Sequence, residues 1–215
     1  MRFTFIVLMG CCFIPSFSQV KIYYKDASLS KEVAEKKASF LKSEFKNGDT
    51  LISQLSRLSD NLIIRQKKWI NDRPVGVWFE YALDGQLVSQ RNFNAVTYEK
   101  ELPKIYNNAI DTISCKTCQP AVFGTGAADL NRYLLMNLQI PIESRMLGSK
   151  GRVFICFILT KGGEAQPYTI LRGVDPYIDF AAWELIRQMP AWSPAMKDGE
   201  PIESYYILPI KYLWN

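Results

Sequence analysis

The chain has 215 residues, of which 48% are hydrophobic and 22% charged, so it can bury the core of one domain or of two small ones. Its 26 Lys and Arg against 21 Asp and Glu give a mild, dispersed positive charge, which argues against nucleic-acid binding. The absence of histidine excludes His-dependent triads, His general bases and the common His-containing zinc sites.

Residues 1–18 have the features of a secretory signal. Met1-Arg2 supplies a positive start, residues 3–14 form an apolar core, and Ser16-Phe17-Ser18 is a small-x-small cleavage site. The apolar core is too short to span a bilayer, so we expect cleavage before Gln19. A second interpretation is that Leu8-Met9-Gly10-Cys11, which looks like a bacterial lipobox, leads to acylation of Cys11 and a membrane-tethered lipoprotein.

Residues 19–95 have the pattern of a β-rich region. We predict a short helix over residues 28–38 and then an antiparallel meander, because alternating apolar residues are separated by Asn, Asp, Gly and Pro turns. The predicted strands cover residues 40–45, 51–55, 62–67, 77–83 and 87–93.

One hairpin in this region, residues 71–87, resembles a MORN-like repeat. Gly76-x-Trp78, Tyr81 and Gly85 stand at the expected places of that motif. Such repeats need neighbours to bury their aromatic faces. Trp78 and Tyr81 are therefore expected to be packing residues of a small sheet rather than ligand-stacking residues.

Residues 96–122 form a connector that carries Cys115 and Cys118. A local disulfide is the favoured interpretation in a secreted chain, followed by a free or partner-bonded thiol pair, with zinc binding and redox catalysis behind. Zinc would need four ligands, and Cys156 is the only other cysteine outside the signal. Because Cys156 lies within a predicted strand, we expect a small buried hydrophobe. No metal and no cofactor is predicted.

Residues 123–215 predict a helix followed by a β-β-α-β unit. The first helix covers residues 127–138, with Leu130, Leu134, Leu135 and Leu138 on its apolar side. Strands follow at residues 151–159 and 166–173. A helix over residues 176–189 begins with Asp175 as N-cap and Pro176 at the first helical position, and a last strand covers residues 203–212. The predicted fold class of the whole chain is α+β.

The carboxylates of this region predict no acid–base chemistry. Asp179 and Glu184 lie on the second helix, and Glu200 and Glu203 lie near a turn. No pair has a spacing that such chemistry requires, so we expect all four to be solvated surface groups and the protein not to be an enzyme.

Several motifs in residues 123–215 resemble the C-terminal domain of the TonB energy-transducer family, in its Bacteroidetes form. They are Gly151-Arg152-Val153, Lys161-Gly162-Gly163, the run 172–176 (RGVDP), the run 189–194 (MPAWSP) and Leu208-Pro209-Ile210, preceded by the run 140–145 (IPIESR) and Gly148. The chain departs from the family at Gly163, where an aspartate-glycine turn is usual, and at Gly124-Thr125-Gly126, which replaces a glycine pair.

The resemblance implies a periplasmic protein that binds a peptide. In TonB-like domains a short segment of a TonB-dependent outer-membrane receptor is added as a strand, and ExbB–ExbD motor proteins supply the energy. The β-β-α-β order leaves the last strand at a sheet edge with unpaired backbone groups. The resemblance thus places the docking edge at residues 203–211, with five contact candidates: Tyr205, Tyr206, Ile207, Leu208 and Ile210. Alternation requires about half of these to face the core.

Two other hypotheses remain. In the first, the chain is an envelope adaptor whose MORN-like half binds the partner and whose TonB-like half forms a homodimer. In the second, which we favour least, Cys115 and Cys118 make it a thiol–disulfide enzyme. No apolar segment after residue 18 is long enough to be the membrane anchor of an energy transducer, so energy transduction by this chain itself is doubtful.

The signal prediction can be tested on protein recovered from the envelope of the producing cell. We expect intact-mass and N-terminal peptide mass spectrometry to show a chain that begins at Gln19. A lipid-modified Cys11 at the N-terminus would contradict this and support the lipoprotein interpretation.

Overall fold

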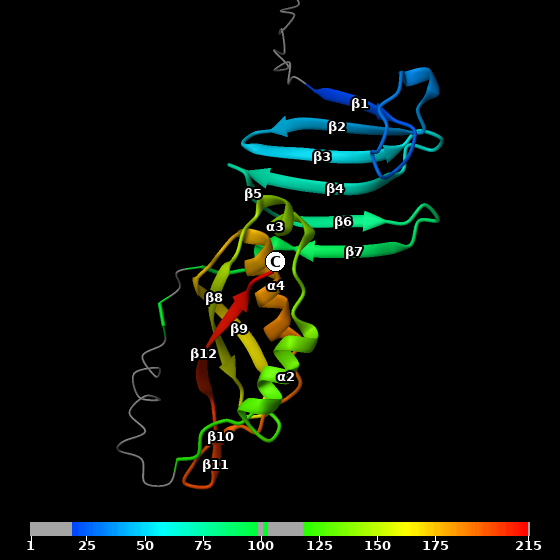
Figure 1. Cartoon of the computed structure of the whole chain (residues 1–215). Helices are drawn as coiled ribbons and strands as arrows, with labels where there is room; N and C mark the ends of the chain where they lie inside the picture. Colours follow the sequence, from blue (N-terminus) through cyan, green and yellow to red (C-terminus); the bar gives the residue numbers. More distant parts are fainter. Residues whose placement is uncertain (1–18, 99–100, 103–117, 215) are drawn as a thin grey trace, which may run out of the picture. The chain divides into compact units, whose positions relative to one another are not determined.

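The structure is a computed structural model that describes residues 19–98, 101–102 and 118–214 (Figure 1). The chain divides into two compact units. Unit 1 comprises Met1–Asp72 and Trp78–Gln90, and unit 2 comprises Arg73–Val77 and Arg91–Asn215. The α+β class is confirmed, because a large antiparallel meander precedes a region of helices and strands. The domain boundaries expected at residues 95 and 122 remain predictions.

Unit 1 is built around an antiparallel sheet with strand order β1-β2-β3-β4-β6-β7. Its strands are β1 (Val20–Tyr24), β2 (Phe40–Asn47), β3 (Thr50–Arg57), β4 (Ile63–Ile70), β6 (Val77–Tyr81) and β7 (Leu87–Asn92). The five strands predicted between residues 40 and 93 are therefore confirmed, while β1 was not predicted. Tight turns such as that at Gly48, where φ is +59°, connect neighbouring strands in sequence order.

The predicted helix over residues 28–38 is wrong. Only the short 3-10 turn η1 (Glu35–Lys37) forms there. The Asp26 carboxylate accepts hydrogen bonds from the hydroxyls of Ser28 and Ser30, an alternative that competes with helical bonding. In addition, the Val33 N–H donates to the Tyr23 carbonyl oxygen at 2.9 Å, which holds this segment against β1.

Trp78 is a packing residue, as predicted for the MORN-like hairpin. It is buried, its ring lies 4.8 Å from that of Trp69 in an edge-to-face contact, and its indole N–H donates to the Lys68 carbonyl oxygen at 2.9 Å. Tyr81 is half-buried and contacts Phe79. The buried cluster of unit 1 is small and consists of Tyr24, Phe40, Leu55 and Ile64.

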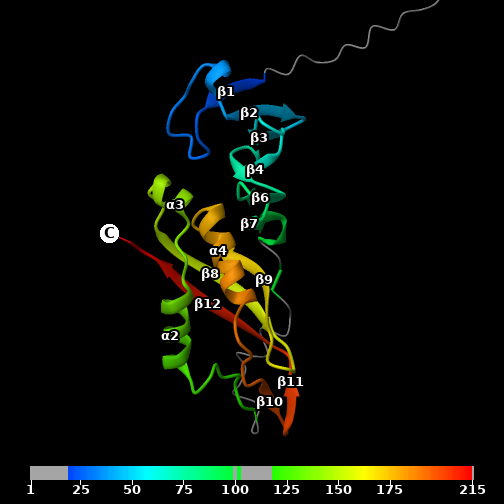
Figure 2. The same cartoon turned by 90° about the vertical axis from the view of Figure 1, so that its right-hand side faces the viewer.

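Unit 2 contains a three-stranded antiparallel sheet with strand order β12-β8-β9 (Figure 2). Its strands are β8 (Gly151–Leu159), β9 (Ala165–Arg172) and β12 (Ser204–Tyr212), and β10 (Ala195–Lys197) pairs with β11 (Glu200–Ile202). The helices are α2 (Ala127–Asn137), α3 (Ile142–Leu147) and α4 (Pro176–Arg187). The predicted β-β-α-β order is confirmed. The short strand β5 (Arg73–Pro74) and the 3-10 turn η2 (Phe93–Ala95) also lie here.

Helix α4 packs on β8 and β9 and supplies much of the core of unit 2. Ile178, Ala182, Leu185 and Ile186 are all buried and form its apolar face. The side chain of Asp175 caps the helix by accepting from the N–H groups of Tyr177 and Ile178, and Pro176 follows at the first position. The rest of the core includes residues of the strands: Val153, Ile155, Phe157, Leu159, Leu208, Ile210 and Tyr212.

Gly163 in the β8–β9 turn has no room for a side chain. Its φ is +84°, and a Cβ there would lie 1.9 Å from the carbonyl oxygen of Trp192. The Trp192 N–H in turn donates to the Gly163 carbonyl oxygen at 2.8 Å. This close approach holds the segment after α4 against the turn between the two strands.

Replacing Gly163 with alanine should therefore destabilise unit 2 far more than replacing Gly199, which has φ +86° but open space around it. Backbone strain alone predicts a loss of roughly 1–2 kcal/mol for Gly199→Ala. The added overlap predicts roughly 3–5 kcal/mol for Gly163→Ala. Urea unfolding of both variants measures the difference, and equal losses would contradict the close contact.

Candidate peptide-docking edge

Strand β12 lies at the edge of its sheet. It pairs with β8 over its whole length, from Ser204 opposite Leu159 to Tyr212 opposite Gly151, with no break in register. Within the described residues, no strand pairs with its other side. Its outer row of backbone N–H and C=O groups is therefore open to an added strand.

Pro209 indicates which backbone groups face the open side. Proline has no N–H to donate, so within a sheet it is accommodated where the nitrogen points away from the neighbouring strand. In an antiparallel pair, successive residues point their backbone groups alternately toward and away from the partner. Tyr205, Ile207 and Lys211 therefore share the outward phase of Pro209, whereas Tyr206 bonds to β8.

The side chains of the five contact candidates divide between the two faces of the sheet. Leu208 and Ile210 are buried in the core beside α4, so they can offer a partner only their backbone. Tyr206 lies on the same face but is 37% exposed, with its ring 5.1 Å from Trp192 and 5.6 Å from Phe157. This aromatic cluster is the side-chain surface nearest the edge on that face.

Tyr205 and Ile207 lie on the opposite face of the sheet and are half-buried. The Tyr205 ring makes an edge-to-face contact with Tyr168 at 6.0 Å, and its hydroxyl donates to a carboxylate oxygen of Glu203 at 3.3 Å. Partial burial, with the neighbouring Glu203 carboxylate, raises the pKa of the Tyr205 hydroxyl. Tyr205 therefore stays neutral at physiological pH and presents a polar tip on an apolar face.

Cys156 lies on the same face in the middle of β8 and is free and fully buried, which confirms the expected small hydrophobe. Burial raises the pKa of its thiol to about 11, so it is not a nucleophile at neutral pH. Cys118 takes part in a disulfide, but Cys115 lies outside the described residues. The predicted Cys115–Cys118 pairing therefore remains a prediction.

A cavity of about 510 Å³ lies where β9 leads into α4, within unit 2. Asp179, which we expected on the solvated surface, forms part of its wall and is only 4% exposed. Gly173 makes this burial possible, because a Cβ on residue 173 would lie 2.1 Å from an Asp179 carboxylate oxygen. The other predicted surface carboxylates are not buried, and Glu184 pairs with Arg187.

The buried Asp179 carboxylate is held by two donors. The Val174 N–H donates to Oδ1 at 2.9 Å and the Tyr98 hydroxyl donates to Oδ2 at 3.2 Å. Burial raises the pKa of Asp179 to about 6, since these hydrogen bonds offset only part of the desolvation and the Asp175 charge also opposes ionisation. The group ties the connector residue Tyr98 to the start of α4.

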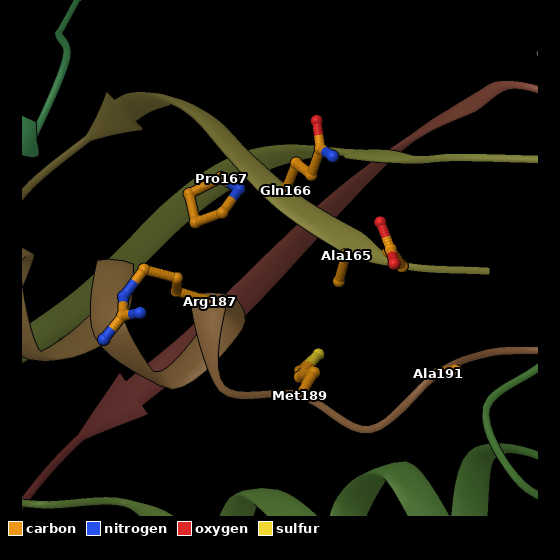
Figure 3. Close-up of a pocket in the computed structure, with 7 residues that line it drawn as sticks. Ala165, Gln166, Pro167, Arg187, Met189 and Ala191 are labelled. Atoms are coloured by element: carbon orange, nitrogen blue, oxygen red, sulfur yellow. The ribbon is translucent and has the colours of Figure 1, made fainter. Parts of the chain in front are cut away.

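A second, shallower cavity of about 330 Å³ lies between the start of β9 and the end of α4 (Figure 3). Figure 3 shows Met189 and Arg187 opposite Pro167 and Gln166. The Arg187 guanidinium is already paired with Glu184 at 2.6 Å. In the described part of the chain, no group of three or more His, Cys, Asp or Glu side chains is placed to hold a metal ion.

A comparison with protein families identifies the class of unit 2. Residues 136–213 match the family described as "Gram-negative bacterial TonB protein C-terminal". This confirms the resemblance predicted from the sequence over this segment, from the end of α2 to the end of β12. No curated protein and no solved structure gives a match.

The match supports a TonB-like role in TonB-dependent transport at the cell envelope, in a family that is not enzymatic. Members of this family interact in general with outer-membrane receptors. No helix in the described ranges is long and apolar enough to cross a membrane. Residues 1–18, with the expected signal and the lipobox at Cys11, lie outside the described residues.

The buried carboxylate predicts a pH dependence of stability. The folded pKa of Asp179, about 6, exceeds the ordinary value of 3.8, so its contribution is greatest below pH 4 and is lost as the pH rises through 6. Asp179→Asn can still accept from Val174 and bond Tyr98, and it carries no charge. Relative to the parent, this variant should gain on the order of 2–3 kcal/mol of unfolding free energy between pH 4 and pH 8.

Asp129→Asn is a control of opposite sign in the same unit. The Thr125 hydroxyl and N–H lower the pKa of the exposed Asp129 carboxyl, so its contribution is present above pH 4 and lost in acid. Its replacement should therefore become more harmful as the pH rises. Urea unfolding at several pH values measures both, and a parallel response of the two variants would contradict the assignment.

Proposed function

We propose that this chain is a TonB C-terminal-like peptide-binding protein of the periplasm that takes up a segment of a TonB-dependent outer-membrane receptor as a strand along β12. The observation that carries the proposal is the open edge of β12 within a domain that matches the TonB C-terminal family. Main-chain hydrogen bonds would supply the affinity in this mode and the neighbouring side chains the selectivity.

The edge favours a short segment near the N-terminal half of β12. Tyr205 and Ile207 each offer a backbone N–H and a backbone C=O on the open side of the strand, whereas Pro209 offers only a carbonyl oxygen. A receptor segment paired with residues 205–207 would place alternate side chains beside the Tyr206–Trp192 cluster and beside Tyr205–Tyr168. These aromatic neighbours favour apolar side chains on both faces of the bound segment.

We propose an ExbB–ExbD-type motor as a further partner of the protein. The alternative function is an envelope adaptor in which the MORN-like hairpin of unit 1 binds the partner and unit 2 forms a homodimer. The observation that favours it is that Leu83 and Leu87 of this hairpin and the adjoining Val88 are each more than half exposed.

Proline substitution tests strand addition directly. Tyr205→Pro removes one outward donor but no bond to β8, whereas Tyr205→Ala removes only a side chain. We expect Tyr205→Pro to weaken binding of a receptor peptide at least tenfold and Tyr205→Ala to weaken it less than threefold. Fluorescence anisotropy with labelled peptides from the periplasmic N-terminal segments of candidate receptors measures both, and circular dichroism confirms folding.

Two further variants control the outcome. Tyr206→Ala removes part of the aromatic cluster and leaves the backbone of β12 unchanged. It should therefore change which peptides are preferred, while main-chain hydrogen bonding at the edge is retained. Leu87→Ser/Val88→Ser alters only the hairpin of unit 1 and should leave peptide affinity unchanged. Parent-like affinity of a folded Tyr205→Pro protein would overturn strand addition, and loss of binding in the hairpin variant would favour the adaptor.

A further inference from the structure

Unit 2 carries an exposed apolar surface that its own fold does not use. Five large apolar side chains within thirteen residues, Leu135 and Met136 of α2 and Ile142, Met146 and Leu147 of α3, are between 63% and 82% exposed. We call these five residues the α2–α3 patch. In Figure 2 both helices lie on the same flank of the unit, on one side of α4. Exposed apolar groups on this scale mark an interaction surface.

The orientation of α2 explains why the patch is exposed. The helix packs with Leu130, Tyr133 and Leu134 toward the core, and the Tyr133 hydroxyl donates to the Leu185 carbonyl oxygen at 2.9 Å. Leu135, predicted on the apolar side of this helix, instead faces solvent because α4 occupies only the neighbouring face. Substitution within the patch should therefore leave the core intact.

Helix α3 is attached to the unit through its polar groups. Ser144 is fully buried and donates to the Asp175 carboxylate at 2.9 Å, while Glu143 pairs with Arg91. The apolar side chains of α3 consequently point away from the core. The five side chains of the patch thus contribute neither to the N-cap of α4 nor to the packing of the sheet.

The charges around the patch are positive. Arg132 lies on α2, Arg145 lies on α3 and Lys150 follows α3. Of these, Arg145 and Lys150 form no ion pair in the described part of the chain. The two acidic residues of this stretch are both engaged, since Asp129 accepts from Thr125 and Glu143 pairs with Arg91. The Lys150 ammonium also lies 5.9 Å from the Trp214 ring centroid.

We propose that the α2–α3 patch docks unit 2 onto an anionic lipid bilayer. Protruding apolar side chains beside cations that form no ion pair in the described part of the chain are the composition of a surface that lies in a membrane interface. Both cavities described above lie elsewhere in the unit, at the two ends of α4. A fluid bilayer can receive protruding apolar side chains without a cavity of complementary shape.

Vesicle co-sedimentation tests the proposal on the chain from Gln19 onward, which lacks Cys11 and so cannot bind through an acyl group. We expect binding to vesicles of phosphatidylglycerol and phosphatidylcholine, and at least tenfold weaker binding to phosphatidylcholine alone. Leu135→Ser/Met146→Ser should weaken binding to the anionic vesicles at least tenfold. Arg145→Gln/Lys150→Gln should weaken it and flatten its dependence on salt.

Leu83→Ser/Val88→Ser is the matched control, because it removes two apolar side chains of unit 1 that are each more than half exposed. It should bind anionic vesicles like the parent, and thermal melts of all variants should overlap closely. Absence of binding to anionic vesicles would overturn the proposal. A second result would also overturn it. In that case the parent forms a concentration-dependent dimer in sedimentation velocity, and Leu135→Ser/Met146→Ser abolishes this dimer but leaves vesicle binding unchanged.

Discussion

Unit 2 depends on the junction between β9 and α4. Gly173 leaves space for the Asp179 carboxylate, which accepts from Val174, and Asp175 caps the helix that begins at Pro176. This local arrangement fixes the direction in which α4 leaves the sheet, and with it the burial of Ile178, Ala182 and Ile186 over β8. Because β9 occupies the other side of β8, β12 pairs with β8 alone among the described strands and lies at the edge of the sheet.

The open edge is compatible with a stable free protein. Its outward backbone groups bond to water when no partner is present, so exposure costs little, and Pro209 removes one donor from the row. A partner strand therefore gains from exchanging water for ordered hydrogen bonds only where its side chains also find the aromatic groups beside the edge.

Sequence reasoning succeeded where local signals suffice. Asp175 and Pro176 marked the start of α4, and alternation marked β8 and β12. The failures arise from contacts between residues that periodicity does not relate. Asp179 is buried because of a glycine six residues earlier, Leu135 is exposed because α4 covers only the adjacent face, and residues 28–38 bond to β1 and to Asp26 instead of forming a helix. The six-residue helix α3 has too few turns to show a period.

The edge of β12 and the α2–α3 patch are surfaces of different physical kind. Hydrogen bonds between backbone groups are nearly independent of ionic strength, whereas attraction of Arg145 and Lys150 to anionic headgroups weakens as salt shortens the Debye length to about 8 Å at physiological strength. The two surfaces also belong to different elements, the last strand and the helices before β8, so neither need be covered when the other is used. A protein that rests on a bilayer through α2 and α3 could still offer β12 to a membrane-bound partner, since confinement to the same surface raises the effective concentration of both. A short peptide added as a strand has only modest intrinsic affinity, so this enrichment increases its binding. That gain is a physical reason for unit 2 to expose the five apolar side chains of the patch.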